Sequence, residues 1–134
     1  MDEDLGRGEV SLSGLQLSLM RVLWGRGEAS TAEVAEALRG DRDLAHTTVA
    51  TLLTRLEKRG LLSSRREGRA LLYTPRVSET DVQRSMVGSL VDRLFAGRAS
   101  VLLSHLLDAR GVDAQELAAL QALLKQRKLE VHHD

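Results

Sequence analysis

Four threonines lie within eight residues near the middle of the chain, at positions 47, 48, 51 and 54. Apolar residues recur between them at the i, i+3, i+4 and i+7 spacing of one helical face, so Thr47, Thr48 and Thr51 share the opposite face with Arg55. Threonine is a poor helix former, and exposed threonines lower helix stability without improving packing. Their hydroxyls can hydrogen-bond phosphates or bases, their methyls can contact thymine methyls, and arginine suits a phosphate or a guanine. The stretch therefore predicts a helix that reads double-stranded DNA.

A second group of candidate residues follows this helix directly. Gly60 ends the helical pattern, and Arg65, Arg66 and Arg69 crowd a short polar turn. Arginines beside a DNA-reading helix would contact phosphates or the minor groove, and such contacts set affinity and register more than sequence choice. The residues predicted to contact DNA are His46, Thr47, Thr48, Ala50, Thr51, Arg55, Arg65, Arg66 and Arg69.

The distribution of charge supports a polyanionic partner, although the whole chain has a formal net charge of +0. Residues 42–76 carry eight Lys+Arg and three Asp+Glu, a net charge of +5. The flanking residues 1–41 and 77–134 carry net charges of −4 and −1. A basic segment between acidic flanks is a local electrostatic footprint, and a polyanion responds to that local charge.

Caps and hydrophobic period indicate the elements that must position these residues. Ser13 predicts the start of a first helix, and Ser30 with Glu33 forms an S-x-x-E capping box for a second. Residues 67–69 predict the turn of a hairpin, and Pro75 ends its second strand because proline cannot continue the ladder. The expected elements are helices at 13–24, 30–39 and 45–59 and strands at 61–66 and 70–74. This order is typical of a winged helix-turn-helix module.

Residues 78–128 hold three further amphipathic helices, expected at 78–95, 99–108 and 113–128. The last turn of the final helix would contain Lys125, Arg127 and Lys128, where cations complement the helix dipole. These three helices are too short a stretch to enclose a core of their own. They could pack back onto the winged module or interleave with a second copy of the chain, and their wide leucine face favours the second copy. The residues predicted to form a homodimer are Val87, Leu90, Val91, Leu94, Phe95, Leu102, Leu103, Leu106, Leu107, Leu117, Leu120 and Leu124.

The elements together predict a mainly α fold with a small β-hairpin wing. We expect a flexible N-terminal arm at residues 1–11 and a winged helix-turn-helix domain at 12–76. A helical dimerisation region at 77–128 and a polar tail at 129–134 would follow.

Composition and motifs exclude several classes of protein. The chain has no cysteine, which excludes disulfides and thiolate metal sites, and no apolar run near the roughly 18 residues of a membrane span. Its four histidines show no metal-ligand spacing, and neither a phosphate-binding glycine loop nor a paired-carboxylate motif is present. We therefore expect no metal, no cofactor and no enzymatic activity, and a cytoplasmic protein without a membrane insertion.

Four stretches of the chain resemble the penicillinase-repressor (BlaI/MecI) family of bacterial transcriptional regulators. They are LMRVLW at 19–24, TAEVAEAL at 31–38, DLAHTTVATLLTRLEKRGLL at 43–62 and GRALLYTP at 68–75. The resemblance implies a homodimeric repressor with an N-terminal winged helix, a C-terminal dimerisation region and inverted-repeat operators that overlap promoters. It also implies that a membrane-bound sensor protease signals cleavage within the dimerisation region. The family's cleavage point is an Asn-Phe pair, and the corresponding residues here are Ser104 and His105.

Two other functions remain open from the residues alone. A winged-helix module can dock a protein partner without contacting DNA, although such a module needs no local cationic face. A regulator of the multidrug-resistance type would instead bind a small molecule between its domains. The chain has only Trp24, Tyr73 and Phe95 as aromatic residues, which disfavours a small-molecule recognition pocket.

Overall fold

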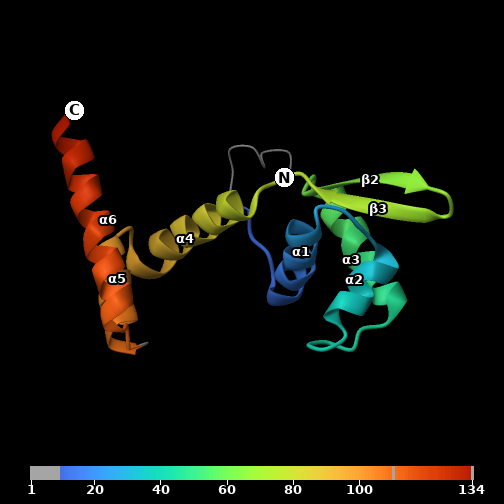
Figure 1. The fold of residues 1–134 in the computed structure, drawn as a ribbon, viewed down its shortest axis with the longest axis horizontal. Coiled ribbons are helices and arrows are strands. Elements are labelled where there is room, and N and C mark those ends of the chain that lie inside the picture. The colour runs from blue at the N-terminus through green and yellow to red at the C-terminus, as the bar shows by residue number, and fades with distance from the viewer. Residues whose placement is uncertain (1–9, 110, 134) are drawn as a thin grey trace. The chain divides into compact units, whose positions relative to one another are not determined.

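The computed structural model describes residues 10–109 and 111–133, and it is mainly helical with one small antiparallel sheet (Figure 1). The elements are α1 (Gly14–Arg26), β1 (Ala29–Ser30), α2 (Thr31–Leu38), α3 (His46–Lys58), β2 (Leu62–Glu67), β3 (Ala70–Pro75), α4 (Glu79–Phe95), α5 (Ala99–Ala109) and α6 (Ala114–His133). The chain divides into two compact units, one ending at Ser89 and one beginning at Leu90. The fold class expected from the sequence is confirmed.

Capping residues begin the first two helices directly after the positions that the sequence predicts. The Ser30 hydroxyl accepts the backbone N–H of Glu33 at 3.2 Å, and the Glu33 carboxylate accepts the N–H of Ser30 at 2.8 Å. This second bond is the main reason that the pKa of Glu33 lies below its usual range. Ser13 forms the same reciprocal box with Gln16. Each box satisfies N–H groups that have no partner inside the helix, which defines the helix start.

The β2–β3 hairpin forms the wing and projects beyond α2 and α3 (Figure 1). Its strands pair up to Glu67 and Ala70, and Gly68 in the turn has a positive φ of 62°, which favours glycine. A third strand, β1, pairs with the other edge of β3, with Ala29 opposite Tyr73. Strand β1 is not predictable from the sequence, because two residues are too few to show the alternation of a strand.

The winged unit has one hydrophobic core, which fixes the orientation of α3. Val49, Leu53 and Leu56 of α3 are fully buried, so the opposite face of this helix must point outward. The other buried residues from α1 to β3 are Leu19, Met20, Leu23, Ala29, Val34, Leu38, Leu61, Leu62 and Tyr73. Leu15, Trp24, Ala35 and Leu52 are half-buried at the margin of this core.

The segment just before α1 is part of this core, so the expectation of a loose arm up to residue 11 is wrong for its last residues. Val10 and Leu12 are both 5% exposed. The backbone N–H of Val10 donates to the Ser85 hydroxyl at 2.6 Å, and the Ser11 carbonyl accepts Nη2 of Arg59 at 3.0 Å. Two apolar residues around one serine carry too little pattern to predict burial. Residues 1–9 of the expected arm lie outside the described residues.

The first part of α4 also belongs to the winged unit. Val82 is 1% exposed within the core, and the indole N–H of Trp24 donates to the Val77 carbonyl at 2.9 Å. The compact unit therefore ends inside α4, at Ser89, whereas the sequence predicts a boundary at residues 76 and 77. The local sequence marks the start of α4 but not the distant core on which it packs.

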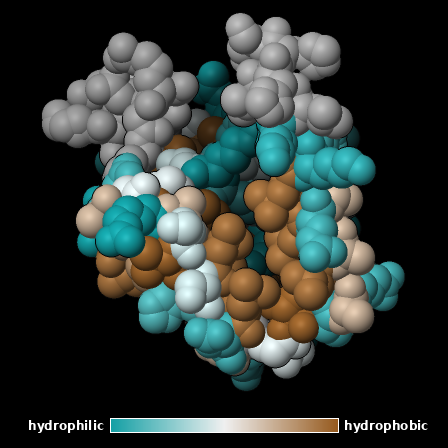
Figure 2. Space-filling view, turned by 90° about the vertical axis from the view of Figure 1, so that its left-hand side faces the viewer, coloured by the Kyte–Doolittle hydropathy of each residue, from teal (hydrophilic) through white to brown (hydrophobic). Residues whose placement is uncertain are grey.

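The C-terminal unit carries many exposed hydrophobic side chains. Figure 2 views the side on which α5 and α6 lie in Figure 1 and shows hydrophobic side chains gathered there. The Phe95 and His105 rings pack together within this unit, with centroids 5.5 Å apart. The exposed large hydrophobic residues of the unit are Leu90, Leu94, Leu103, Leu106, Leu107, Leu117, Leu123 and Leu124.

Helix α6 is longer than the sequence predicts. It continues to His133, so its expected end at residue 128 is wrong, and Lys125, Arg127 and Lys128 lie before its last turn. No glycine or proline follows Gly111, so nothing in the sequence stops the helix. None of the described helices is both long and apolar enough to span a lipid bilayer.

Candidate nucleic-acid interface

The outward face of α3 carries a row of polar and cationic side chains. Thr48, Thr51, Arg55 and Lys58 are exposed and follow one another at three- and four-residue intervals, so they line one side of the helix. Together with Thr47 and Leu52, the first three of them line a shallow hollow on this face. The opposite side is held in the core, and the row is therefore presented on a rigid element. Lys58 was missed by the sequence analysis, although its spacing from Arg55 signalled it.

The threonine hydroxyls of α3 fall into two groups. The Thr51 hydroxyl donates to the carbonyl of Thr47 at 2.9 Å, and the Thr54 hydroxyl donates to the carbonyl of Ala50 at 2.9 Å. A hydroxyl has one hydrogen, so these two can only accept further bonds. The hydroxyls of Thr47 and Thr48 make no hydrogen bond within the described part of the chain and can still donate. Thr51 therefore offers a base its methyl group and lone pairs, whereas Thr48 also offers a proton.

The N-terminus of α3 differs from those of α1 and α2. Ala45 occupies the N-cap position and provides no side-chain hydrogen bond. The first N–H groups of a helix need a partner from outside it, and anions are favoured there by the helix dipole. His46 is exposed in this first turn, whereas Ala50 is half-buried. The free N–H groups at the start of α3 can thus donate to a phosphate oxygen next to the threonine row.

The three wing arginines do not form one cluster, contrary to what the sequence predicts. Side chains alternate across a strand, so Arg65 and Arg66 project from opposite faces of β2. The Ser64 hydroxyl donates to Glu57 of α3 at 2.6 Å, which places Ser64 and Arg66 on the α3 side. Arg69 follows Gly68 in the turn and is exposed. On the wing, Arg66 therefore lies on the α3 side and Arg69 lies in the exposed turn, while Arg65 lies on the other face.

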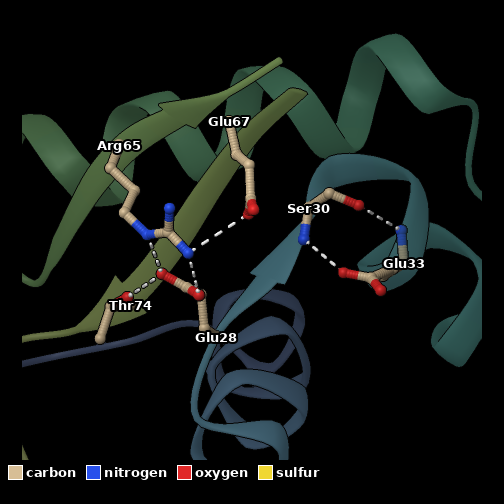
Figure 3. A network of polar contacts seen from close by, with 6 residues as sticks. All are labelled: Glu28, Ser30, Glu33, Arg65, Glu67 and Thr74. Atoms are coloured by element: carbon tan, nitrogen blue, oxygen red, sulfur yellow. Dashed lines mark hydrogen bonds and ion pairs between the residues drawn. The ribbon is translucent and has the colours of Figure 1, made fainter. Parts of the chain in front are cut away.

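Arg65 is engaged by a residue that the sequence analysis did not single out. Its guanidinium donates from Nε and Nη2 to Glu28, each at 2.9 Å, and from Nη2 to Glu67 at 3.3 Å (Figure 3). The hydrogen bonds from Arg65 hold the pKa of Glu28 below its usual range, and Glu28 in turn raises the pKa of Arg65. Glu28 and Arg65 are 37 positions apart, so no local pattern could have paired them.

The residues predicted for dimerisation and cleavage lie on the C-terminal helices. Ser104 and His105 are both exposed near the middle of α5. Most of the predicted dimerisation residues are exposed, including Val87 of the winged unit. The half-buried ones are Val91, Phe95, Leu102 and Leu120. In the described part of the chain, no three His, Cys, Asp or Glu side chains gather as metal ligands would.

A three-helix unit with an outward polar third helix and a β-hairpin wing is a winged helix-turn-helix. The family model described as penicillinase repressor matches residues 12–126, and the chain belongs to this family. The transcriptional regulator BlaI of Mycobacterium tuberculosis is 37% identical over 124 residues, which cover 91% of this chain and 87% of that protein. The penicillinase repressor of Bacillus licheniformis is 28% identical over 117 residues, covering 87% and 91%.

A solved structure shows the same fold at low sequence identity. The oxidized form of MarR from E. coli superposes with a TM-score of 0.50 at 16% identity, over 87% of this chain and 75% of that chain. The winged-helix fold is therefore shared more widely than the penicillinase repressor family.

Proposed function

We propose that this protein is a homodimeric transcriptional repressor that binds inverted-repeat operator DNA through α3 and the wing. The observation that carries the proposal is the exposed threonine and cation row of α3, held by a buried opposite face and lying beside a basic wing. Relatives that carry the names penicillinase repressor and transcriptional regulator BlaI support the same function.

Within this proposal, α3 enters the major groove and reads bases. The groove is about 12 Å wide and admits one helix, and small side chains near the helix N-terminus allow a close approach. Thr47, Thr48 and Thr51 are such residues, with His46 beside them in the first turn and Ala50 at the edge of the face. Arg55 lies one turn further on and can reach a guanine edge or a phosphate.

Cations outside the groove would supply most of the binding strength. Arg66 and Arg69 on the wing and Lys58 at the end of α3 are exposed and suited to phosphate oxygens. Such contacts hold the protein in register on the duplex but do not distinguish sequences. We therefore assign base reading to α3 and phosphate binding to the wing and Lys58.

Two copies of the chain would join through the C-terminal helices, within residues 77–128. The exposed leucines of α4, α5 and α6 support this, because a monomeric soluble protein rarely exposes a wide contiguous apolar surface. A two-fold dimer explains an inverted-repeat operator, since each copy reads one half-site. The repressor would act in the cytoplasm and without catalysis.

Relief of repression by cleavage, which the family resemblance implies, would need a local opening of the chain. Ser104 and His105 lie inside α5, where the backbone carbonyls and N–H groups are used by the helix. A protease acts on a transiently opened segment, so the opening of α5 would limit the rate of cleavage.

A hollow in the winged unit is a candidate site for gating by a small molecule, but it is smaller than a usual ligand pocket. The hollow between α1 and the start of α4 is lined by Leu17, Trp24, Val82 and Met86 and has a volume of about 210 Å³. Ligand pockets are usually about 300 Å³ or larger. We therefore assign no small-molecule effector to this site.

The test of the proposed function starts with the full chain and fragmented genomic DNA. Fragments that the purified protein retains should share an inverted repeat with two half-sites about one helical turn apart, or a multiple of it. The logarithm of the affinity for such a fragment, plotted against the logarithm of the salt concentration, should fall with a slope of roughly −0.9 for each phosphate neutralised. A slope near zero, or retained fragments without a common repeat, would overturn the proposal.

A further inference from the structure

The carboxylate of Glu28 connects the three strands of the winged unit. Glu28 immediately precedes β1, and it accepts two bonds from Arg65 of β2 and one from the Thr74 hydroxyl of β3, the last at 3.3 Å (Figure 3). Two parallel N–H bonds to one carboxylate fix the orientation of a guanidinium as well as its position. We call Glu28, Arg65 and Thr74 the clamp.

The clamp lies where the three-stranded sheet becomes a two-stranded wing. Leu72 of β3 pairs with Ser30 of β1 on one side and with Arg65 of β2 on the other. Beyond this row β1 ends, and residues 66–71 pair only with each other. A two-stranded hairpin by itself is marginally stable in water. The position of the outer wing therefore depends on how firmly this row is held.

The positive charge of Arg65 is already paired with carboxylates of the protein. Its guanidinium lies 2.9 Å from Glu28 and 3.3 Å from Glu67. Among the described residues, Arg66 and Arg69 have no such ion pair, and both lie beyond the clamp on the outer wing. Arg65 would have to give up two carboxylates to bind a phosphate, whereas Arg66 and Arg69 would give up none.

We propose that Glu28 and Arg65 are positioning residues, which hold the root of the wing so that Arg66 and Arg69 meet the DNA backbone. Arg65 is then not itself a phosphate contact. This inference rests on the proposed DNA binding and adds to it a residue, Glu28, that lies outside the predicted contact set. An acidic residue thus supports the binding of a polyanion.

An exposed ion pair usually contributes little to stability, and the clamp is partly exposed, with side-chain exposures of 56% for Arg65 and 34% for Glu28. Bidentate geometry and a network of several groups are the conditions under which such a pair has an effect. Loss of the clamp should therefore loosen the outer wing without changing the free energy of folding of the winged unit.

The experiment compares the DNA affinities of Glu28→Gln, Arg65→Gln and the double variant. It uses the full chain and the genomic fragment that the unaltered protein binds most tightly. At 200 mM salt, counterion release makes each phosphate contact worth roughly fourfold in affinity, and the proposed dimer has two wings, so loosening Arg66 and Arg69 should weaken binding by at least about tenfold. We expect all three variants to show this same loss. Glu28→Gln is decisive, because it makes the protein more positive and would strengthen binding if charge alone mattered.

Glu36→Gln is the matched control. Glu36 is an exposed carboxylate of α2 that pairs with Arg39, so this variant removes one negative charge without touching the clamp. It should bind DNA at least as well as the unaltered protein. The proposal is overturned if Glu28→Gln binds DNA as tightly as this control. It is also overturned if the fold-loss of affinity in the double variant equals the product of the fold-losses in the two single variants, because the two residues would then act independently.

Hydrogen exchange without DNA separates this inference from the proposed function. The backbone amides of residues 66–71 should exchange faster in Glu28→Gln and Arg65→Gln, while the amides of α3 should not change. If the unaltered protein bound no DNA, the proposed function would fail, yet the exchange data would still show whether the clamp holds the wing. Equal exchange in all proteins would overturn the clamp itself.

Discussion

Thr48 and Thr51 differ in what they can still offer a base, and this difference predicts opposite responses to two conservative substitutions. The Thr51 hydroxyl donates to the Thr47 carbonyl, with 2.9 Å between the two oxygens, whereas the Thr48 hydroxyl makes no hydrogen bond within the described part of the chain. Valine keeps the branched shape and the methyl group but removes the hydroxyl. Serine keeps the hydroxyl and removes the methyl. The two variants therefore separate donation of a proton from apolar contact.

The magnitudes follow from these assignments and are given for each half-site, so the proposed dimer on a full operator should show the squares of these fold-changes. Thr48→Val should lose a hydrogen bond worth about 0.5–1.5 kcal/mol, which is roughly a twofold to twelvefold loss of affinity. Thr51→Val should change affinity by less than about twofold, since no donated bond to DNA is lost. Thr51→Ser should lose the contact of one methyl group, about 0.8 kcal/mol or roughly fourfold. Thr48→Ser should bind nearly as well as the unaltered protein.

Fluorescence anisotropy on the selected operator, at one fixed salt concentration, measures all four variants. A second operator with uracil in place of thymine tests the methyl contact directly, because uracil lacks the C5-methyl group. The unaltered protein should bind the uracil operator more weakly than the thymine operator. The Thr51→Ser variant should bind the two operators with nearly the same affinity. Equal losses for Thr48→Val and Thr51→Val would refute this assignment of roles. Valine and threonine have similar helix propensities, so melting temperatures should serve only as a check on folding.

Three further predictions concern the core, the dimer and pH. Leu53→Ala, at a fully buried position of α3, should lower the free energy of unfolding by about 3 kcal/mol in urea titration, and a loss below about 1 kcal/mol would contradict the described core. Leu106→Glu, on exposed α5, should shift sedimentation from dimer to monomer, which an unchanged profile would disprove. The pKa of Glu28 is lowered from 4.5, so its clamp is intact above that pH and is lost as pH falls through the lower folded value. The protection factors of the wing amides, which are corrected for the intrinsic pH dependence of exchange, should therefore not change between about pH 7 and 5, and weaker protection in that range would contradict the pairing.

The local signals of the sequence determined the helices and the hairpin. The Ser30–Glu33 box acts between groups three residues apart, and the period of Val49, Leu53 and Leu56 reflects one turn of helix after another. Such bonds form within a single element, so their residues are visible as spacing in the chain. The same spacing predicted the outward threonine face, which the structure places opposite the core.

Only the tertiary structure decided which residues meet across the winged unit. The burial of Val10 and Val82, the pairing of β1 with β3 and the bond between Glu28 and Arg65 each join segments that are far apart in the chain. Their energies depend on how whole elements pack, and no spacing within one element encodes them. Hence the sequence grouped Arg65 with its neighbours in the turn, while the sheet separated it from Arg66 and paired it with a carboxylate at the start of β1.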